Sequence, residues 1–274
     1  MFTYLRLTRT ATYGLLATIP LLIGYECLIV LANARATDQV RVSADVWTKS
    51  IARPLLELLG VHGNLGLGLV VLVMGLVLYL RDRIRTNREA DERQEDAEYV
   101  EDWDAAEKRR LRFRPGYLVG MVAEGLVLAV ILASGVSMTV RYLMHEVFAG
   151  SPAMMSVALD SPQFWQYLAL SLGAGLYEEF VFRLLLMVIL TSFFTSLFRV
   201  RTVAYIVAAL ISAAAFSAIH YIGPYGDEWR VVTFVYRFIF GLALQGLMLA
   251  RGFAVAAWTH ALYDVLVICG AWDS

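Results

Sequence analysis

The sequence predicts an all-α membrane protein, a multi-pass bundle of about seven transmembrane helices with one charged loop. The 274 residues are 59% hydrophobic and only 17% charged, with a mean hydropathy of +0.63, whereas soluble domains are about a quarter charged. Residues 81–115 hold 10 of the 23 Lys and Arg and 11 of the 24 Asp and Glu. Outside this loop lie seven apolar segments, each close to the ~20 residues that a crossing helix needs.

The seven predicted spans are expected to be helices, because a single segment in lipid must satisfy its own backbone hydrogen bonds. The first span is not expected to be a cleaved signal peptide. It lacks a small-residue cleavage site, and its apolar part is longer than a usual signal core. The predicted spans are residues 12–33, 64–80, 116–139, 164–190, 202–220, 231–250 and 252–270.

Two segments outside the spans have helical patterns of their own. Residues 42–60 are amphipathic but too polar to cross, so they either lie in the outer interface or pack on the outer face of the bundle. Residues 86–110, inside the charged loop, carry both signs of charge at helical spacing. That pattern is typical of a solvated helical arm, and an arm that docks a partner is the alternative.

The distribution of Lys and Arg predicts the orientation of the bundle. A cytoplasmic N-terminus and a cytoplasmic loop 81–115 place 15 Lys and Arg inside and six outside. Because cytoplasmic loops are enriched in these residues, we expect the N-terminus inside and the C-terminus outside. The net charge of −1 gives no reason to expect nucleic acid as a partner.

Ionisable residues inside predicted spans are costly in lipid and are candidates for function. Most of them fall in the last four spans. They are Glu26, Glu124, Glu178, Glu179, Arg183, His220, Arg237, His260 and Asp264.

Glu178, Glu179 and Arg183 form an E-E-x-x-x-R pattern in the fourth span. Glu179 and Arg183 are four residues apart and share a helix face. Glu178 is rotated by about 100° from Glu179, so Arg183 is expected to neutralise Glu179 while Glu178 points elsewhere. The alternative is a salt-bridge cluster that only fixes helix packing, but such a cluster needs no second acid.

Two histidines occur in pairs of the same spacing in later spans. Phe216 and His220 end the fifth span, where an interfacial or hydrogen-bonded histidine is the alternative to a functional one. His260 and Asp264 share a face of the seventh span. The carboxylate fixes the orientation of the imidazole ring, or each group points at a substrate. A hydrogen-bonded helix clamp without a function is the alternative.

If Glu178, His220 and His260 converge, they suit peptide-bond hydrolysis by an activated water. A carboxylate beside a neutral imidazole can hold a water and take its proton, and a second imidazole can donate to the oxyanion. Two histidines and one carboxylate can also hold zinc with an open position, so a metal site on these three residues remains an alternative.

Other hydrolase signatures are missing from the sequence. It contains no G-x-S-x-G motif for a serine nucleophile. His145 and Glu146 do not start an H-E-x-x-H zinc motif, because Ala149 stands where the second histidine belongs. Cys27 and Cys269 both lie in apolar runs and predict neither a disulfide framework nor a cysteine zinc site.

The order and spacing of these motifs resemble a known family. Three motifs occur in spans in the order E-E-x-x-x-R, F-x-x-x-H and H-x-x-x-D, with the glycine-spaced stretch RFIFGLALQG (237–246) between the last two. Together they resemble the CPBP family of CAAX-processing and bacteriocin-processing intramembrane proteases, also called the Abi family, over residues 165–270. The resemblance implies a catalytic core at 164–274, preceded by an N-terminal membrane region at 1–163.

The resemblance also implies roles for six residues. Glu178 corresponds to the glutamate that activates water, and His220 to a residue that helps hold that water. Glu179 and Arg183 correspond to supporting residues. His260 and Asp264 fall where the family places its oxyanion-side residues. The CAAX-protease branch implies a glutamate mechanism that needs no cofactor, while zinc stays open because many family members are labelled metalloproteases.

Three positions depart from the pattern or are unexplained by it. Asp264 stands where Asn is common, and an ionised Asp would repel an oxyanion, so Asp264 must either be protonated or orient His260. Gln245 replaces an expected glycine, so it either loosens a helix contact or lines the pocket. Arg237 either offsets the surplus negative charge around Glu178 or reaches the outer interface.

Helix geometry raises one difficulty for convergence. At 1.5 Å per residue, His260 is roughly 13 Å from the inner face and His220 roughly 27 Å. Straight, perpendicular helices would keep the two histidines apart. Tilt, a shifted start of the fifth span or a dip in the turn is therefore required.

The expected function is that of an intramembrane endopeptidase that cleaves a membrane-associated protein or peptide with a glutamate-activated water. The expected location is a bacterial cell (inner) membrane. The expected partners are the membrane-associated substrate and the lipid bilayer. The alternative is a non-enzymatic immunity or scaffold protein of the same fold that binds a membrane partner. A transporter is a third class, but the sequence has no obvious inverted repeat.

Overall fold

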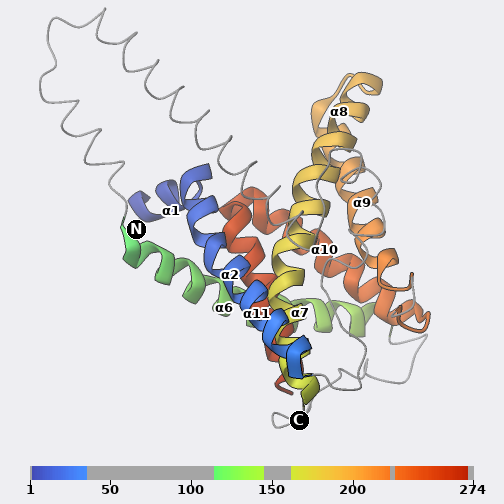
Figure 1. Ribbon diagram of the computed structural model, residues 1–274. Coiled ribbons are helices and arrows are strands. Elements are labelled where there is room, and N and C mark those ends of the chain that lie inside the picture. Colours follow the sequence, from blue (N-terminus) through green and yellow to red (C-terminus); the bar gives the residue numbers. More distant parts are fainter. Residues whose placement is uncertain (1, 36–113, 145–161, 223–225, 271–274) are drawn as a thin grey trace, which may run out of the picture.

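The computed structural model describes residues 2–35, 114–144, 162–222 and 226–270, and within these ranges the chain is helical with no strand. Figure 1 shows the arrangement. The helices are α1 (Phe2–Thr8), α2 (Ala11–Arg35), α6 (Pro115–Met144), α7 (Pro162–Glu178), α8 (Met187–Leu197), α9 (Arg201–Ile219), α10 (Val231–Arg251) and α11 (Phe253–Ile268), with a π-helix, η1 (Glu179–Leu186), between α7 and α8. The predicted all-α fold class is confirmed.

The predicted spans inside the described ranges all correspond to apolar helices. Four helices are long and apolar enough to cross a membrane, and two more are apolar but shorter. The fourth span was predicted to end at residue 190, but its helix continues to Leu197. The long helices are Pro115–Met144, Gln163–Leu197, Arg201–Ile219 and Val231–Arg251, and the shorter apolar stretches are Leu16–Ala32, which lies within α2, and Phe253–Ile268.

Several predictions concern residues outside the described ranges. These are the second span at 64–80, the amphipathic segment at 42–60, the helical arm at 86–110 and nearly all of the charged loop 81–115. The cytoplasmic placement of the N-terminus likewise stays a prediction, because it concerns the membrane rather than the fold.

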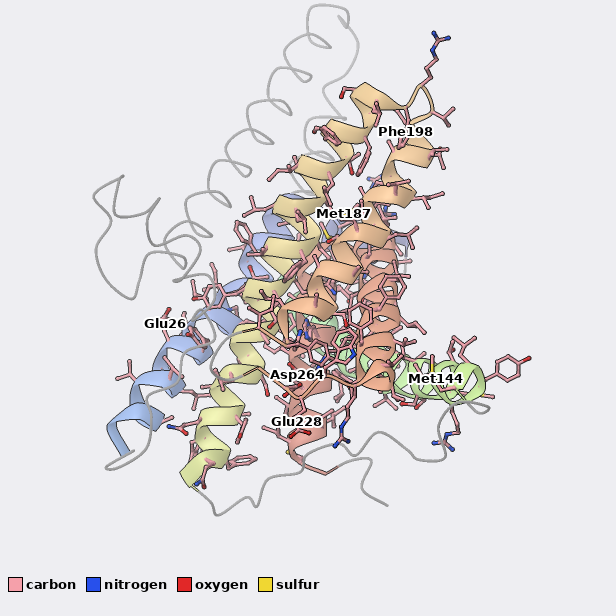
Figure 2. The ribbon with its side chains drawn as sticks, turned by 90° about the vertical axis from the view of Figure 1, so that its right-hand side faces the viewer. Glu26, Met144, Met187, Phe198, Glu228 and Asp264 are labelled. Atoms are coloured by element: carbon pink, nitrogen blue, oxygen red, sulfur yellow. The ribbon has the colours of Figure 1, made fainter. Side chains whose placement is uncertain are left out.

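Helix α11 lies in the middle of the bundle and contacts α2, α6, α7 and α10. Helix α8 pairs with α9, and together they project beyond the other helices at one end (Figure 1). Figure 2 shows Phe198 at this projecting end, and Asp264 and Glu228 towards the opposite end. Large apolar side chains such as Val188, Ile189 and Phe193 are exposed on α8, as expected for a face in contact with lipid.

The crossing of α7 and α11 depends on Gly175. A Cβ atom added there would lie 2.6 Å from the carbonyl oxygen of Ala257 and 2.6 Å from both Cβ and N of Ala261. The two helix backbones therefore approach each other closely at this glycine. Because α7 ends at Glu178 and α11 carries His260, this crossing brings the two side chains near each other.

The π-helix η1 was not predicted from the sequence, because the fourth span was expected to be a uniform α-helix. Wide π turns disturb the regular pairing of backbone groups and are frequent at functional sites. Here the hydroxyl of Ser212 on α9 donates to the carbonyl oxygen of Phe182 at 2.7 Å, and this bond is buried. The neighbouring helix thus supplies a donor to the carbonyl of a residue inside the π segment.

Two acids in the earlier predicted spans, Glu26 and Glu124, form contacts that join helices of the bundle. Glu124 on α6 binds the guanidinium of Arg251 and accepts a hydrogen bond from the Tyr4 hydroxyl at 2.7 Å. Glu26 on α2 accepts a hydrogen bond from the Tyr177 hydroxyl at 3.3 Å. These contacts join α1 and α10 to α6, and α7 to α2.

Candidate active site

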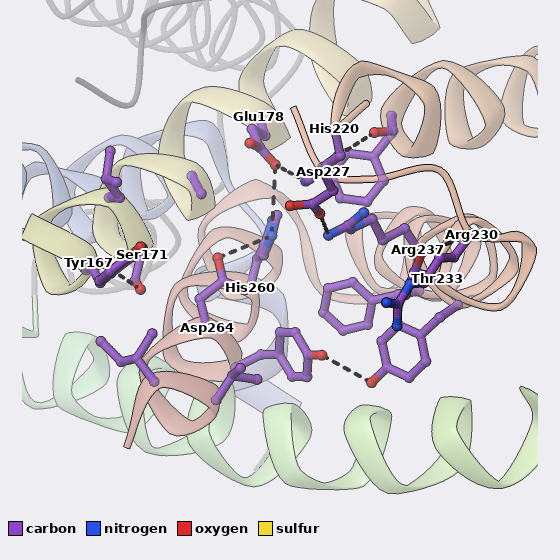
Figure 3. Close-up of a pocket in the computed structure, with 18 of the residues that line it drawn as sticks. Tyr167, Ser171, Glu178, His220, Asp227, Arg230, Thr233, Arg237, His260 and Asp264 are labelled. Atoms are coloured by element: carbon purple, nitrogen blue, oxygen red, sulfur yellow. Dashed lines mark hydrogen bonds and ion pairs between the residues drawn. The ribbon is translucent and has the colours of Figure 1, made fainter. Parts of the chain in front are cut away.

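A cavity of about 570 Å³ opens between α7, α9, α10 and α11 and the segment before α10. Figure 3 shows polar side chains from all of these elements pointing into it. Catalytic candidates from three helices line its wall, and they are Glu178, His220, His260 and Asp264. Glu179 and Arg183 lie directly behind them and are buried.

Glu178 is the last residue of α7, at the junction with the π-helix. Its Oε2 atom lies 3.9 Å from Nε2 of His220 and 3.9 Å from Nε2 of His260. These separations are too long for direct hydrogen bonds. Oε2 is buried and has no hydrogen-bond partner within the described part of the chain. The carboxylate therefore faces a gap between two imidazole rings.

His220 caps the C-terminal end of α9, where the helix turns into the segment leading to α10. Its Nδ1 lies 2.8 Å from the carbonyl oxygen of Phe216, four residues earlier. A carbonyl oxygen can only accept, so Nδ1 carries the proton. In the neutral ring, Nε2 is then an acceptor, and it faces Glu178. The F-x-x-x-H spacing thus fixes the tautomer of His220.

His260 on α11 is held from behind by Glu179. Its Nδ1 donates to Oε1 of Glu179 at 2.8 Å, and the same oxygen lies 3.2 Å from Nη1 of Arg183. Glu179 is completely buried. Arg183 therefore neutralises Glu179 as the i, i+4 spacing predicted, and the carboxylate also orients the His260 ring.

Asp264 faces the exposed side of His260. Its Oδ2 lies 3.7 Å from His260 Nε2, and its side chain is 29% exposed. The i, i+4 pairing on one face, predicted from the sequence, is present. The six predicted site residues thus lie in one connected cluster.

Phe216 is the packing centre of this cluster. The guanidinium carbon of Arg183 lies 4.1 Å from the centroid of its ring, within range of a cation–π contact. The rings of His220 and His260 meet the same phenyl group edge to face, with centroids 5.1 and 5.7 Å away. Phe216 thereby holds both imidazoles at fixed angles.

Sequence reasoning missed Asp227, which lies between two spans and therefore outside the search for intramembrane charges. It forms an ion pair with Arg237, and both line the cavity. This contact explains where Arg237 goes, which the sequence left open. Gln245 does not line the cavity. Its amide nitrogen donates to the Tyr205 hydroxyl and so links α10 to α9.

The three candidate zinc ligands stand further apart than the ligands of a tetrahedral zinc ion. Zinc ligands at about 2.0–2.2 Å from the metal would place their atoms about 3.4 Å apart, below the 3.9 Å from Glu178 to each histidine. Within the described ranges, no group of three or more His, Cys, Asp or Glu side chains is arranged to hold a metal ion.

Comparison with known proteins agrees with the motifs. Residues 160–266 match the family described as "Type II CAAX prenyl endopeptidase Rce1-like". No curated protein and no solved structure gives a significant match. The matched range contains all six site residues and indicates an intramembrane protease whose substrate is a membrane-associated protein. Residues 160–266 thus resemble the CAAX protease family, and the resemblance predicted from the motifs in this part of the chain is confirmed.

Proposed function

We propose that this protein is an intramembrane endopeptidase that hydrolyses a peptide bond with a water activated by Glu178. One observation carries the proposal. The Glu178 carboxylate faces Nε2 of two histidines across equal gaps of 3.9 Å, with no partner of its own at Oε2 within the described residues. A polar contact of this length suits a single bridging water.

Glu178 and His220 both accept hydrogen bonds toward this gap. A water there donates one hydrogen to the Glu178 carboxylate and the other to Nε2 of His220, which leaves its lone pairs facing outward. When the water oxygen adds to a peptide carbonyl carbon, Glu178 takes its proton. Glu178 then gives this proton to the amide nitrogen as the carbon–nitrogen bond breaks, releasing an acid and an amine.

His260 and Asp264 stabilise the oxyanion that forms when the water adds to the carbonyl carbon. Nδ1–H of His260 is already committed to Glu179, so donation to the oxyanion requires a second proton on Nε2. The resulting imidazolium would lie between Glu179 and Asp264, and Arg183 would balance the remaining charge of that pair. Asp264 therefore acts by orienting and stabilising His260 rather than by donating a hydrogen bond itself.

In this proposal the reaction needs no metal ion, and the bundle lies with its N-terminus in the cytoplasm of a bacterial cell. The zinc alternative would use Glu178, His220 and His260. The 3.9 Å spacings favour a bridging water over a shared ion. The excess of Lys and Arg in the loop 81–115 supports the orientation.

The test compares cells that carry wild-type protein with cells that carry Glu178→Gln, at matched protein levels. New peptide termini are mapped in the membrane and secreted proteomes. Termini that vanish with the variant would identify substrates and the side of cleavage together. Glu228→Gln is the matched control, because Glu228 lines the same cavity but its side chain is 92% exposed.

Unchanged termini would contradict the proposal. If deletion of the whole protein still gave a phenotype, the immunity or scaffold function would be the better explanation. Glu178→Gln removes a charge without changing side-chain size, so the variant is expected to stay folded in the membrane.

A further inference from the structure

The cavity contains a second charged pair away from Glu178, formed by Arg237 and Asp227. Arg237 extends from α10, and its Nη2 binds the Asp227 carboxylate (Figure 3). Its Nη1 is buried and has no hydrogen-bond partner among the described residues. The guanidinium carbon lies 5.4 Å from the centroid of the Tyr221 ring. One half of this guanidinium is therefore paired, and the other half is not.

A buried guanidinium nitrogen without a partner is unfavourable, so its position indicates a missing acceptor. The planar group matches a carboxylate, which can bind two of its nitrogens at once. Asp227 occupies one side of this group only. Its side chain is 53% exposed, against 25% for Arg237, so water can solvate Asp227 when another carboxylate replaces it.

We propose that Arg237 is a specificity-determining residue that binds a carboxylate of the substrate, with Asp227 holding that position when no substrate is present. The inference rests on the proposed function, because it concerns the substrate of the same cavity. It extends that function by naming a chemical group that a good substrate must carry.

The other charges of the cavity sharpen this selectivity. Four acids line it, namely Glu178, Asp227, Glu228 and Asp264, and the only arginines or lysines among the described lining residues are Arg230 and Arg237. Arg230 is 66% exposed and lies 4.0 Å from Glu228. An incoming anion would be repelled by the acids unless it reached the partly buried guanidinium of Arg237.

A short series of contacts links Arg237 to the reacting end of the cavity. His220 faces Glu178 through Nε2, and its carbonyl oxygen accepts a hydrogen bond from the Asp227 N–H at 2.8 Å. Arg237 is thus separated from the reacting water by one histidine and one aspartate.

Two sources of this carboxylate are chemically equivalent, the C-terminal α-carboxylate of the substrate and an acidic side chain near its cleavage site. The test therefore uses three fluorescent peptides with an S-farnesylated cysteine followed by three residues. The first ends in a free acid after three apolar residues, and the second is its C-terminal amide. The third is an amide whose last residue is aspartate.

Full-length protein in lipid vesicles is assayed for cleavage, and Glu178→Gln protein for peptide binding by fluorescence anisotropy. We expect wild type to prefer the acid over the plain amide by about 10- to 100-fold in kcat/KM, mainly through KM. Arg237→Gln should remove this preference, because kcat/KM falls much more for the acid than for the amide. Arg237→Lys should keep part of the preference, and Asp227→Asn should lower KM for the acid.

Arg230→Gln is the matched control, because it removes a cation from the same cavity that is exposed and paired with Glu228. It should change the acid preference little. Cleavage of the aspartate-bearing amide as fast as the free acid would assign the site to an acidic side chain. Slow cleavage of that peptide would assign it to the C-terminal carboxylate.

The two proposals fail in different ways. Equal binding and cleavage of acid and amide by wild type, or an equal loss of both in Arg237→Gln, would overturn the role of Arg237. Acid-selective binding that depends on Arg237, without any cleavage, would support Arg237 and count against the hydrolytic function. Cleavage that persists in Glu178→Gln would overturn the proposed mechanism alone.

Discussion

Replacing Gly175 with alanine should separate the two halves of the active site without touching any polar residue. The new Cβ would lie 2.6 Å from the Ala257 carbonyl oxygen and from two atoms of Ala261. Real Cβ atoms do not approach other atoms this closely, so α7 and α11 must move apart by several tenths of an ångström or more. Two of the three contacts are with backbone atoms, which cannot rotate away.

The expected size of the effect follows from these contacts. Overpacking of a tight interface typically costs about 1–3 kcal/mol in folding free energy. Catalysis should suffer more, because a shift near 1 Å in the relative position of reacting groups can reduce the rate about 100-fold. Glu178 follows Gly175 by one helical turn, and His260 precedes Ala261 directly, so the shift acts at the reacting groups.

The assay measures kcat on a cleaved peptide and the thermal unfolding midpoint in detergent. Gly246→Ala is the matched control, because a Cβ there would meet no atom within 4 Å. Adding Ala261→Gly to Gly175→Ala should restore activity only in part, since the Ala257 carbonyl oxygen still blocks the new methyl group. A Gly175→Ala enzyme with wild-type kcat and stability would refute the reasoning.

Two further predictions concern the buried charges behind the site and the zinc alternative. Glu179→Gln leaves the buried Arg183 without its carboxylate and should reduce stability by about 3–5 kcal/mol, measured as thermal unfolding in detergent against Glu228→Gln. Wild-type stability of Glu179→Gln would mean that Arg183 has another counterion. Incubation with a strong zinc chelator should leave the cleavage rate unchanged, and a loss of activity that added zinc restores would instead favour the metal alternative.

The sequence predicted relations within a helix well. Glu179 with Arg183, and His260 with Asp264, are both i, i+4 pairs, and helical geometry alone puts each pair on one face. Such pairs need no knowledge of neighbouring helices. The assignment of Arg183 to Glu179 rather than to Glu178 followed from the same geometry.

Contacts between side chains on different helices could not be predicted from the spacing of residues within one helix. The depth estimate kept His220 and His260 apart because it measured both from one inner plane. The α8–α9 pair projects beyond the other helices (Figure 1), so counting residues from Arg201 overstates the depth of His220. Asp227 gave no signal because it lies between spans, and its partner Arg237 could be placed only once the helices were packed together.

The π-helix also has a consequence for the angular phase of the long helix Gln163–Leu197. A wide turn sets back the direction of every later side chain relative to a uniform α-helix. The segment before η1 can therefore keep its inner face on α2 and α11, while the segment after it turns its face toward α9. Lengthening or shortening η1 by one residue would rotate one half of this helix against the other by about 100°. Glu178 and Glu179 stand at the junction, where the ordinary rotation between adjacent helical residues sends one carboxylate into the cavity and the other behind it.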